Sequence, residues 1–160
     1  MRFKNERRGG FNARSSGGRC GALSPPPRRL PLLEPPSAFY WTSGADGRLR
    51  IQHCDSCGRW QHPPWPRCTA CTSEAVTPTA VSGRGRIATF TINFEAWLPG
   101  LEVPFVIAAV ELEEQAELYV FTNILAPVDS VRIGMPVSVT FERHDEIFLP
   151  MFVPAEVDHG

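Results

Sequence analysis

The sequence predicts a mainly β protein in which a short N-terminal helix and a cysteine-rich ribbon precede a five-stranded barrel. Three observations predict this fold class. Four of the five cysteines form two C-x2-C pairs, strand-length apolar segments separated by turn residues follow them, and no segment has the length of a βαβ crossover helix. With 160 residues, 42% apolar and 21% charged, the chain suits one ordinary domain or two very small ones and is not wholly disordered.

The first 33 residues differ in composition from the rest of the chain. They hold eight Lys and Arg residues and one Glu, whereas residues 34–160 hold eight basic and 16 acidic side chains. This segment is rich in Arg, Gly, Ser and Pro and too poor in apolar residues to offset the entropy of ordering, so we expect a disordered basic tail. A solvated extension is the favoured interpretation. An arm that binds nucleic acid or another anionic surface and an organelle transit peptide are the alternatives.

Composition divides the chain into three expected parts: residues 1–33 as the tail, 34–78 as the helix and ribbon, and 79–160 as the barrel. No apolar run approaches the ~18 residues that a membrane helix needs. The N-terminus also lacks the hydrophobic core of a secretory signal. We therefore expect a cytoplasmic protein without a membrane span.

The segment from Pro36 to Gly44 predicts a short helix, with Ser37 as the N-cap and Gly44 as the stop. It carries three consecutive aromatic residues, 39–41, which suit either a core or a docking surface. An Asp-Gly turn at 46–47 then leads into a strand over 48–53, whose residues Leu49 and Ile51 share one face.

The four cysteines predict a tetrahedral thiolate site for one metal ion. Each C-x2-C turn directs two sulfurs towards the ion, and two such turns complete the set. Zinc is favoured, and iron in a rubredoxin-like site would use the same thiolates. Two alternatives are less favoured. Two disulfides would need an oxidising compartment, for which the sequence shows no export signal, and a redox C-x2-C would need a thioredoxin-like βαβ unit, which the sequence does not indicate. The expected ligands are Cys54, Cys57, Cys68 and Cys71.

Because cysteine fills all four positions, none stays open for water, and the ion is expected to be structural rather than catalytic. Gly58 follows the second cysteine, where a tight turn needs a positive φ. His53 and His62 would be surplus ligands, and we expect them on the surface of a strand or hairpin. Cys20, in the tail, is expected to be a free thiol.

The remaining segments predict five strands, the second of them nearly continuously apolar. A short connection over 127–135, with one helical turn, separates the third from the fourth. Five strands with a helical connection after the third are typical of an OB-fold barrel. The expected strands cover residues 85–97, 104–112, 118–124, 137–142 and 147–153.

No nucleophile elbow, Walker loop or dinucleotide-binding glycine motif is present in the sequence. The 144–146 and 113–114 charge clusters are interpreted as polar turns, so we expect no catalytic residue and no enzyme activity from this chain alone. OB barrels often bind single-stranded nucleic acid through aromatic side chains. Residues 34–160 are acidic overall, which disfavours binding to a nucleic-acid strand. We therefore expect the aromatic residues that could stack on bases to lie in the core rather than on a binding surface: Phe90, Phe94, Trp97 and Phe121.

A series of motifs in one order carries a resemblance to a known family. They are Phe39-Tyr-Trp41, Gly47-Arg-Leu-Arg-Ile-Gln-His-Cys-Asp-Ser-Cys-Gly58, Pro63-Pro64, Cys68-Thr-Ala-Cys71, Val81-Ser-Gly-Arg-Gly-Arg-Ile87, Pro104-Phe-Val-Ile-Ala-Ala-Val-Glu-Leu112, Val131-Arg-Ile-Gly-Met-Pro-Val137 and Leu149-Pro-Met-Phe-Val-Pro-Ala155. The chain resembles, from about residue 36 to 155, the zinc-ribbon/OB-fold family of acyl-CoA-associated proteins, the domain of unknown function numbered thirty-five.

The resemblance implies a non-catalytic, zinc-binding scaffold subunit in lipid metabolism. Such subunits sit beside a thiolase-like enzyme or a MaoC-type enoyl-CoA hydratase, help assemble the complex and accommodate the CoA thioester. We expect Arg84, Arg86 and Trp97 to meet acyl-CoA, unless they form only a salt-bridged or exposed edge. We expect Phe39, Tyr40, Trp41 and Phe105 to contact the partner protein. A single-stranded nucleic-acid-binding OB module that uses the basic tail is the alternative function.

Overall fold

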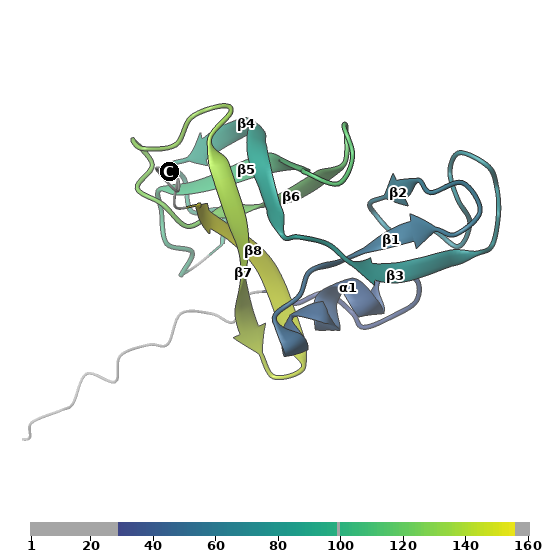
Figure 1. The fold of residues 1–160 in the computed structure, drawn as a ribbon. Coiled ribbons are helices and arrows are strands. Elements are labelled where there is room, and N and C mark those ends of the chain that lie inside the picture. Colours follow the sequence, from purple (N-terminus) through teal and green to yellow (C-terminus); the bar gives the residue numbers. More distant parts are fainter. Residues whose placement is uncertain (1–28, 99, 156–160) are drawn as a thin grey trace, which may run out of the picture.

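A computed structural model describes residues 29–98 and 100–155 (Figure 1). The expected disordered tail, apart from residues 29–33, and Cys20 lie outside the described residues. The elements are a helix α1 (Ala38–Thr42), a 3-10 helix η1 (Ser43–Asp46), and the strands β1 (Arg50–Cys54), β2 (Trp60–Gln61), β3 (Val76–Ala80), β4 (Arg84–Asn93), β5 (Phe105–Leu112), β6 (Tyr119–Ile124), β7 (Pro136–His144) and β8 (Ile147–Pro154). None of the helices in these ranges has the length and apolarity that crossing a membrane requires.

The predicted helix is present, but its ends differ from the expected ones. Ser37 makes no capping bond to the helix, and its hydroxyl donates instead to the Glu34 carbonyl. The helical segment continues after α1 into η1, which contains Gly44, and ends at Gly47, whose φ is +75°. A Cβ on Gly44 would lie 2.5 Å from the Phe141 ring and 2.6 Å from the Phe148 Cβ. Gly44 is therefore a site of close packing against the β7–β8 hairpin, not a helix stop.

The ribbon is a three-stranded antiparallel sheet with β1 in the centre, between β2 and β3. Its strands are short, and β2 has only two residues. Sheets this small are marginally stable in water without further support. The ribbon therefore depends on contacts beyond its own backbone ladder.

The second half of the chain is a closed barrel in the order β4-β5-β6-β8-β7. Neighbouring strands are antiparallel except for β6 and β8, which are parallel. The predicted five-stranded barrel is thereby confirmed. The expected helical turn within residues 127–135 is a hydrogen-bonded turn instead, because the end of this connection is tied to β4: Ile87 exchanges backbone bonds with Gly134 and Met135.

One apolar core joins the two halves of the molecule. The buried cluster includes Tyr40 from α1 and Leu49 and Ile51 from the ribbon, together with Ile87, Phe152 and other barrel residues. In Figure 1, α1 lies against the lower part of the β7–β8 hairpin. Ribbon, helix and barrel are therefore packed as one unit.

Side chains of the β5–β6 turn attach the barrel to β2, an edge strand of the ribbon. The Gln115 side chain accepts a hydrogen bond from the Trp60 backbone N–H at 2.9 Å and donates one to the Trp60 carbonyl at 3.1 Å. Glu114 accepts a bond from the Ser82 backbone N–H, at the start of the barrel. The segment interpreted as a polar turn thus sets the orientation of the ribbon, because a side-chain amide takes the place of a neighbouring strand along β2.

We predict that Gln115→Ala lowers the free energy of unfolding by about 1–3 kcal/mol, because both partly buried polar groups of Trp60 lose their partner. Urea denaturation monitored by Trp fluorescence measures this change. The control is Glu113→Ala, which removes an exposed ion pair with Arg84 and should cost less than about 1 kcal/mol. Equal losses in the two variants would contradict a special role for Gln115.

Candidate functional site

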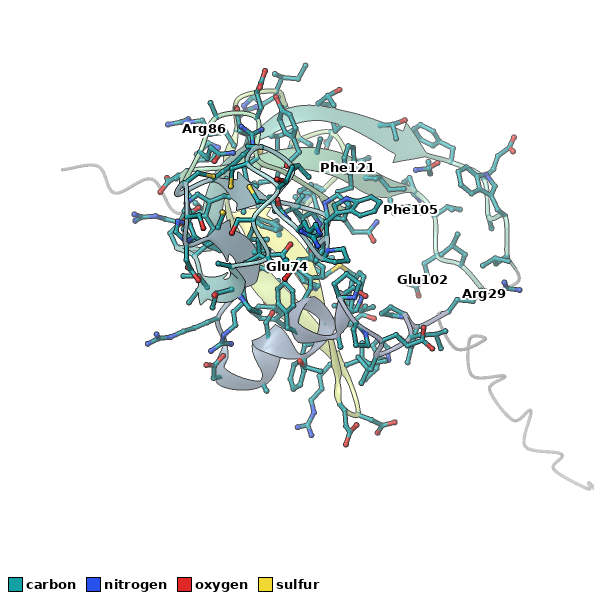
Figure 2. The ribbon with its side chains drawn as sticks, turned by 90° about the vertical axis from the view of Figure 1, so that its right-hand side faces the viewer. Arg29, Glu74, Arg86, Glu102, Phe105 and Phe121 are labelled. Carbon is teal, nitrogen blue, oxygen red and sulfur yellow. The ribbon has the colours of Figure 1, made fainter. Side chains whose placement is uncertain are left out.

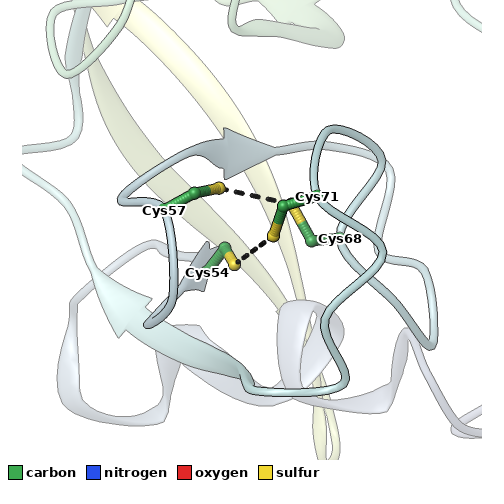
Figure 3. Close-up of side chains that lie close together, drawn as sticks. All are labelled: Cys54, Cys57, Cys68 and Cys71. Carbon is green, nitrogen blue, oxygen red and sulfur yellow. Dashed lines mark hydrogen bonds between the residues drawn. The ribbon is translucent and has the colours of Figure 1, made fainter.

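The structure brings the four predicted cysteines together at one end of the ribbon (Figure 3). Their sulfur atoms all lie within 4.8 Å of one another, and the pairs Cys54–Cys71 and Cys57–Cys68 are each 3.6 Å apart. Around a tetrahedral zinc ion with Zn–S bonds of about 2.3 Å, neighbouring sulfurs lie about 3.8 Å apart. The donor set and its spacing therefore fit a four-thiolate zinc ion.

Two turns of the same design present these sulfurs. In the first, the Gly58 N–H donates to the Cys54 carbonyl, and Gly58 has the expected positive φ of +75°. In the second, the Thr72 N–H donates to the Cys68 carbonyl, and Thr72 has a φ of 62°. A threonine in this left-handed region is uncommon, and the sequence carried no signal of it.

The local environment shifts the pKa values of the cysteine thiols in opposite directions. The backbone N–H groups of Cys71 and Ala70 lower the pKa of the Cys68 thiol to about 6. For Cys57, the Arg59 N–H pulls the pKa down, but hydrogen bonding with neighbouring thiols, Cys71 first, together with desolvation, outweighs it and raises the pKa to about 12. Without a cation, four crowded sulfurs cannot all ionise, so a divalent ion is what turns the cluster into a thiolate set.

A buried pair of glutamines holds the loop that carries Cys68, and the sequence did not reveal it. The Gln61 amide donates to Gln52 Oε1 at 2.7 Å and to the Arg67 carbonyl at 3.1 Å. Their amide oxygens in turn accept bonds from the Trp65 and Thr69 backbone N–H groups, both at 2.9 Å. The second cysteine pair is therefore positioned by side chains on β1 and β2.

Neither histidine near the cysteines belongs to the sulfur cluster. The His53 ring lies 4.7 Å from the Trp60 ring and its Nδ1 is 3.6 Å from Asp55. His62 is not on the hairpin surface as expected, because its ring packs 4.6 Å from that of Tyr40. Burial lowers the pKa of His62 to about 4, so its ring is neutral at pH 7.

A groove of about 400 Å³ lies where α1, the ribbon and the barrel meet. Its walls are mostly aromatic rings and prolines. The lining residues are Ser37, Tyr40, Trp41, His62, Pro63, Pro64, Glu117, Tyr119 and Phe121. A shallower hollow of about 350 Å³ lies beside the β6–β7 connection, lined by Arg132, Ile133, Gly134, Met135, Pro136 and Ala155.

The three residues expected to meet acyl-CoA are not gathered at one point. Arg84 forms an ion pair with Glu113 at 3.1 Å. Arg86 donates to the Gly134 carbonyl, at the wall of the shallower hollow. Trp97 is 68% exposed in the loop after the opposite end of β4. The two arginines therefore lie at the start of β4, whereas Trp97 lies beyond the other end of that strand.

The residues expected to contact a partner differ in exposure. Tyr40 is 4% exposed and belongs to the core, while Phe39 and Trp41 pack against that core with part of each ring outside. Phe105 is half-buried at the start of β5. Of these four residues, Phe39, Trp41 and Phe105 therefore offer aromatic surface that a partner could contact, and Tyr40 does not.

The expectation that the four candidate stacking residues are core residues holds only for Phe90, which packs against the core. Phe94 is 70% exposed and Phe121 is 74% exposed, and Trp97 is also largely exposed. Phe94 and Trp97 lie beyond the end of β4. Phe121 faces outward because its neighbours on β6, Val120 and Thr122, point into the barrel.

Comparison with known proteins gives consistent matches. The family model "ChsH2, rubredoxin-like zinc ribbon domain" matches residues 41–77, and "ChsH2, C-terminal OB-fold domain" matches residues 78–142. The chain is 34% identical, over 129 residues, to a probable enoyl-CoA hydratase alpha subunit of Thermomonospora curvata, covering 80% of this chain and 40% of the relative. It spans about two fifths of the length of the curated hydratase subunits that it matches.

Two further proteins are similar. A benzoylsuccinyl-CoA thiolase subunit, BbsA, of Thauera aromatica is 26% identical over 121 residues, covering 71% of this chain and 82% of the relative. A solved structure titled "Ltp2-ChsH2(DUF35) aldolase" superimposes with a TM-score of 0.71 and 32% identity, covering 79% of this chain and all of the matched chain. The relatives are thus named as subunits of enzymes acting on CoA thioesters, or as part of an aldolase.

We predict that the purified chain binds one zinc ion and that Cys54→Ser loses it, because three thiolates leave the tetrahedral set incomplete. Atomic spectroscopy after exposure to a chelator measures the zinc content. NMR of Trp60, whose ring contacts His53, reports whether the ribbon stays folded. The matched control is Cys20→Ser, which should keep one zinc per chain. A Cys54→Ser protein that retains stoichiometric zinc would refute the assignment.

Proposed function

This chain belongs to the ChsH2 (DUF35) family of zinc ribbon and OB-fold proteins, and on that premise we propose that it is a non-catalytic accessory subunit of an acyl-CoA-processing complex. Its partner in this proposal is a thiolase-like enzyme or a MaoC-type hydratase in lipid metabolism, in the cytoplasm. The observation that carries the proposal is that the relatives are named as hydratase and thiolase subunits.

In this proposal zinc, the one resident metal, is structural. Cys54, Cys57, Cys68 and Cys71 would hold it and leave no position for water or substrate. Metal binding of this kind supplies about 10–16 kcal/mol of apparent free energy at neutral pH. That free energy supports a ribbon whose strands are too short to be stable alone. Zinc would therefore maintain the shape of the subunit rather than take part in a reaction.

The arrangement of the described histidines supports a role without catalysis. His53 lies beside Asp55, His62 packs on Tyr40, and His144 contacts Glu142 at 2.6 Å. A general base needs to be within hydrogen-bond reach of its nucleophile or substrate. Among the described residues, no hydrogen bond joins any of these three rings to a serine, threonine or cysteine that could serve as a nucleophile: His53 and His144 each lie beside a carboxylate, and His62 packs on a tyrosine ring. Catalysis in the complex would then belong to the partner enzyme.

The subunit is also proposed to accommodate the CoA thioester through cationic side chains. Arg86 and Arg132 both border the shallower hollow, the former through its bond to Gly134. Guanidinium groups bind phosphate oxygens in a planar, bidentate manner. The phosphates of CoA would meet this hollow, while Arg84 is partly neutralised by Glu113 and Trp97 lies elsewhere on the barrel.

The alternative, a single-stranded nucleic-acid-binding module, has one observation in its favour: exposed aromatic rings such as Phe121 and Phe94. Binding to a nucleic-acid strand also requires a positive groove along its phosphates. Residues 34–160 hold twice as many acidic as basic side chains. Such binding would therefore depend on the tail and would weaken steeply with salt.

We predict that a tagged chain isolated from its own host carries a thiolase-like or hydratase-like enzyme subunit, identified by mass spectrometry. The chain alone should show no hydratase, thiolase or thioesterase turnover. Mixing it with the purified enzyme subunit should restore a complex on size-exclusion chromatography. Robust turnover by the chain alone would refute the accessory role. Recovery of nucleic acid and nucleic-acid proteins, released by salt, would support the alternative.

We predict that Arg86→Gln weakens binding of CoA to the complex about tenfold, because a charge-assisted contact to phosphate is lost. Isothermal titration calorimetry with CoA measures the change. The control is Arg48→Gln, an exposed arginine at the start of the ribbon, which should leave the affinity within about twofold. Equal affinities for wild type and Arg86→Gln would remove Arg86 from the proposed CoA site.

A further inference from the structure

The outward-facing side of β4, β5 and β6 is set by their register. Thr89, Ala109 and Phe121 lie side by side across the three strands, and Thr91 lies beside Ile107 in the next row. Residues between them on β5 and β6, such as Val106, Val110 and Val120, are fully buried and point inwards. Phe105 is on the outward side because it alternates with Val106.

We call the outward residues Thr89, Thr91, Phe105, Ile107 and Phe121 the Phe121 surface. Thr89, Thr91 and Phe121 are exposed, Phe105 and Ile107 are half-buried, and Ala109 beneath them is only 5% exposed; the register adds Asn123 beside Ile107. None of them carries a charge. The row on the other side of Thr89, Ala109 and Phe121 holds Arg86, Glu111 and Tyr119, so charged side chains border the surface there. Phe105 and Phe121 lie on the same side of the barrel (Figure 2), and Phe105 is two rows along β5 from Ala109, the partner of Phe121 in the register. A phenylalanine 74% exposed in the middle of a strand is costly unless another surface covers it.

The Phe121 surface runs directly into the groove between α1 and the ribbon. Phe121 and Tyr119 line that groove together with Trp41 and Pro63. A projecting ring therefore stands next to a hollow of about 400 Å³. Among the residues that line the groove, Glu117 is the only one with a formal charge. This combination of aromatic centre and polar rim is typical of the core of a protein–protein interface.

We propose that the Phe121 surface and the adjoining groove form the docking site for the enzyme subunit of the complex; this inference rests on the proposed function. The chemistry of the site specifies that of the partner. The partner presents an uncharged apolar surface to Phe121 and Ile107, an apolar side chain that enters the groove, and a basic side chain opposite Glu117. Phe121 is the anchor, because buried aromatic rings contribute most to such interfaces.

Charge and shape favour this occupant over others. A nucleic acid needs cations along its path, and the Phe121 surface has none. A second copy of this chain would bring Glu117, and no basic residue from the groove lining, to the shared site. A separate protein partner with a basic side chain satisfies both the apolar centre and the acidic rim.

The test uses the full chain and the enzyme subunit that copurifies with it from the host. Calorimetry gives the dissociation constant for wild type, Phe121→Ser and the matched control Leu32→Ser. Leu32 is also a large exposed apolar residue, 71% accessible, but it lies in the segment before α1 and lines neither hollow. We expect Phe121→Ser to weaken binding at least about tenfold and Leu32→Ser to change it less than about twofold. Thermal unfolding of each variant verifies that it is folded.

A second variant, Glu117→Lys, tests the acidic rim independently and should also weaken binding, by about fivefold or more. If wild type binds the enzyme and neither Phe121→Ser nor Glu117→Lys weakens it, the docking site is wrong while the accessory role stands. If no enzyme subunit binds wild type, both proposals fail. If Phe121→Ser instead converts a dimer of this chain into a monomer, or abolishes binding to a single-stranded oligonucleotide, a second copy or a nucleic acid is the occupant and the inference is overturned.

Discussion

The convergence of four cysteine sulfurs is the constraint on which the rest of the structure depends. The ribbon has a central strand of five residues and an edge strand of two, which is too little sheet to be stable alone. Two tight turns bring the sulfurs within 4.8 Å of one another, and a divalent ion held there would tie the two loops of the ribbon together. The buried Gln52–Gln61 pair gives the second loop its path. The cysteine cluster and the glutamine pair thus both hold the loops of the ribbon in place.

The ribbon matters because it forms one wall of a groove. Its edge strand is joined to the barrel by Gln115, and its residues Leu49 and Ile51 enter the same core as the barrel. These contacts place His62 and the prolines after it opposite Tyr119 and Phe121. Loss of the metal site would therefore alter the groove, although the cysteines do not line it. The cysteine cluster and the groove are thus physically linked through the ribbon.

The polar side chains of the interior serve the structure, and the exposed apolar side chains are the ones left without an internal role. Gln52, Gln61 and Gln115 are all paired with backbone groups or with one another. Phe121 and Trp97, by contrast, project from the barrel. This distribution is consistent with the proposed accessory role, in which the subunit would act through its surfaces.

The sequence by itself determined the cysteine cluster and the strand segments, since these follow from spacing and periodicity within short stretches, and a series of motifs determined the family by resemblance. The two C-x2-C pairs were sufficient to predict the sulfur cluster, and alternating or continuously apolar segments were sufficient to predict the barrel strands. Only the tertiary structure decided that Phe121 faces outward, that His62 packs on Tyr40 and that Gln115 pairs with Trp60. Those contacts depend on strand register, on the irregularity between Ile87 and Thr89, and on packing between residues up to 55 positions apart. Local patterns carry no information about such distant pairings, because they arise only when the elements pack together.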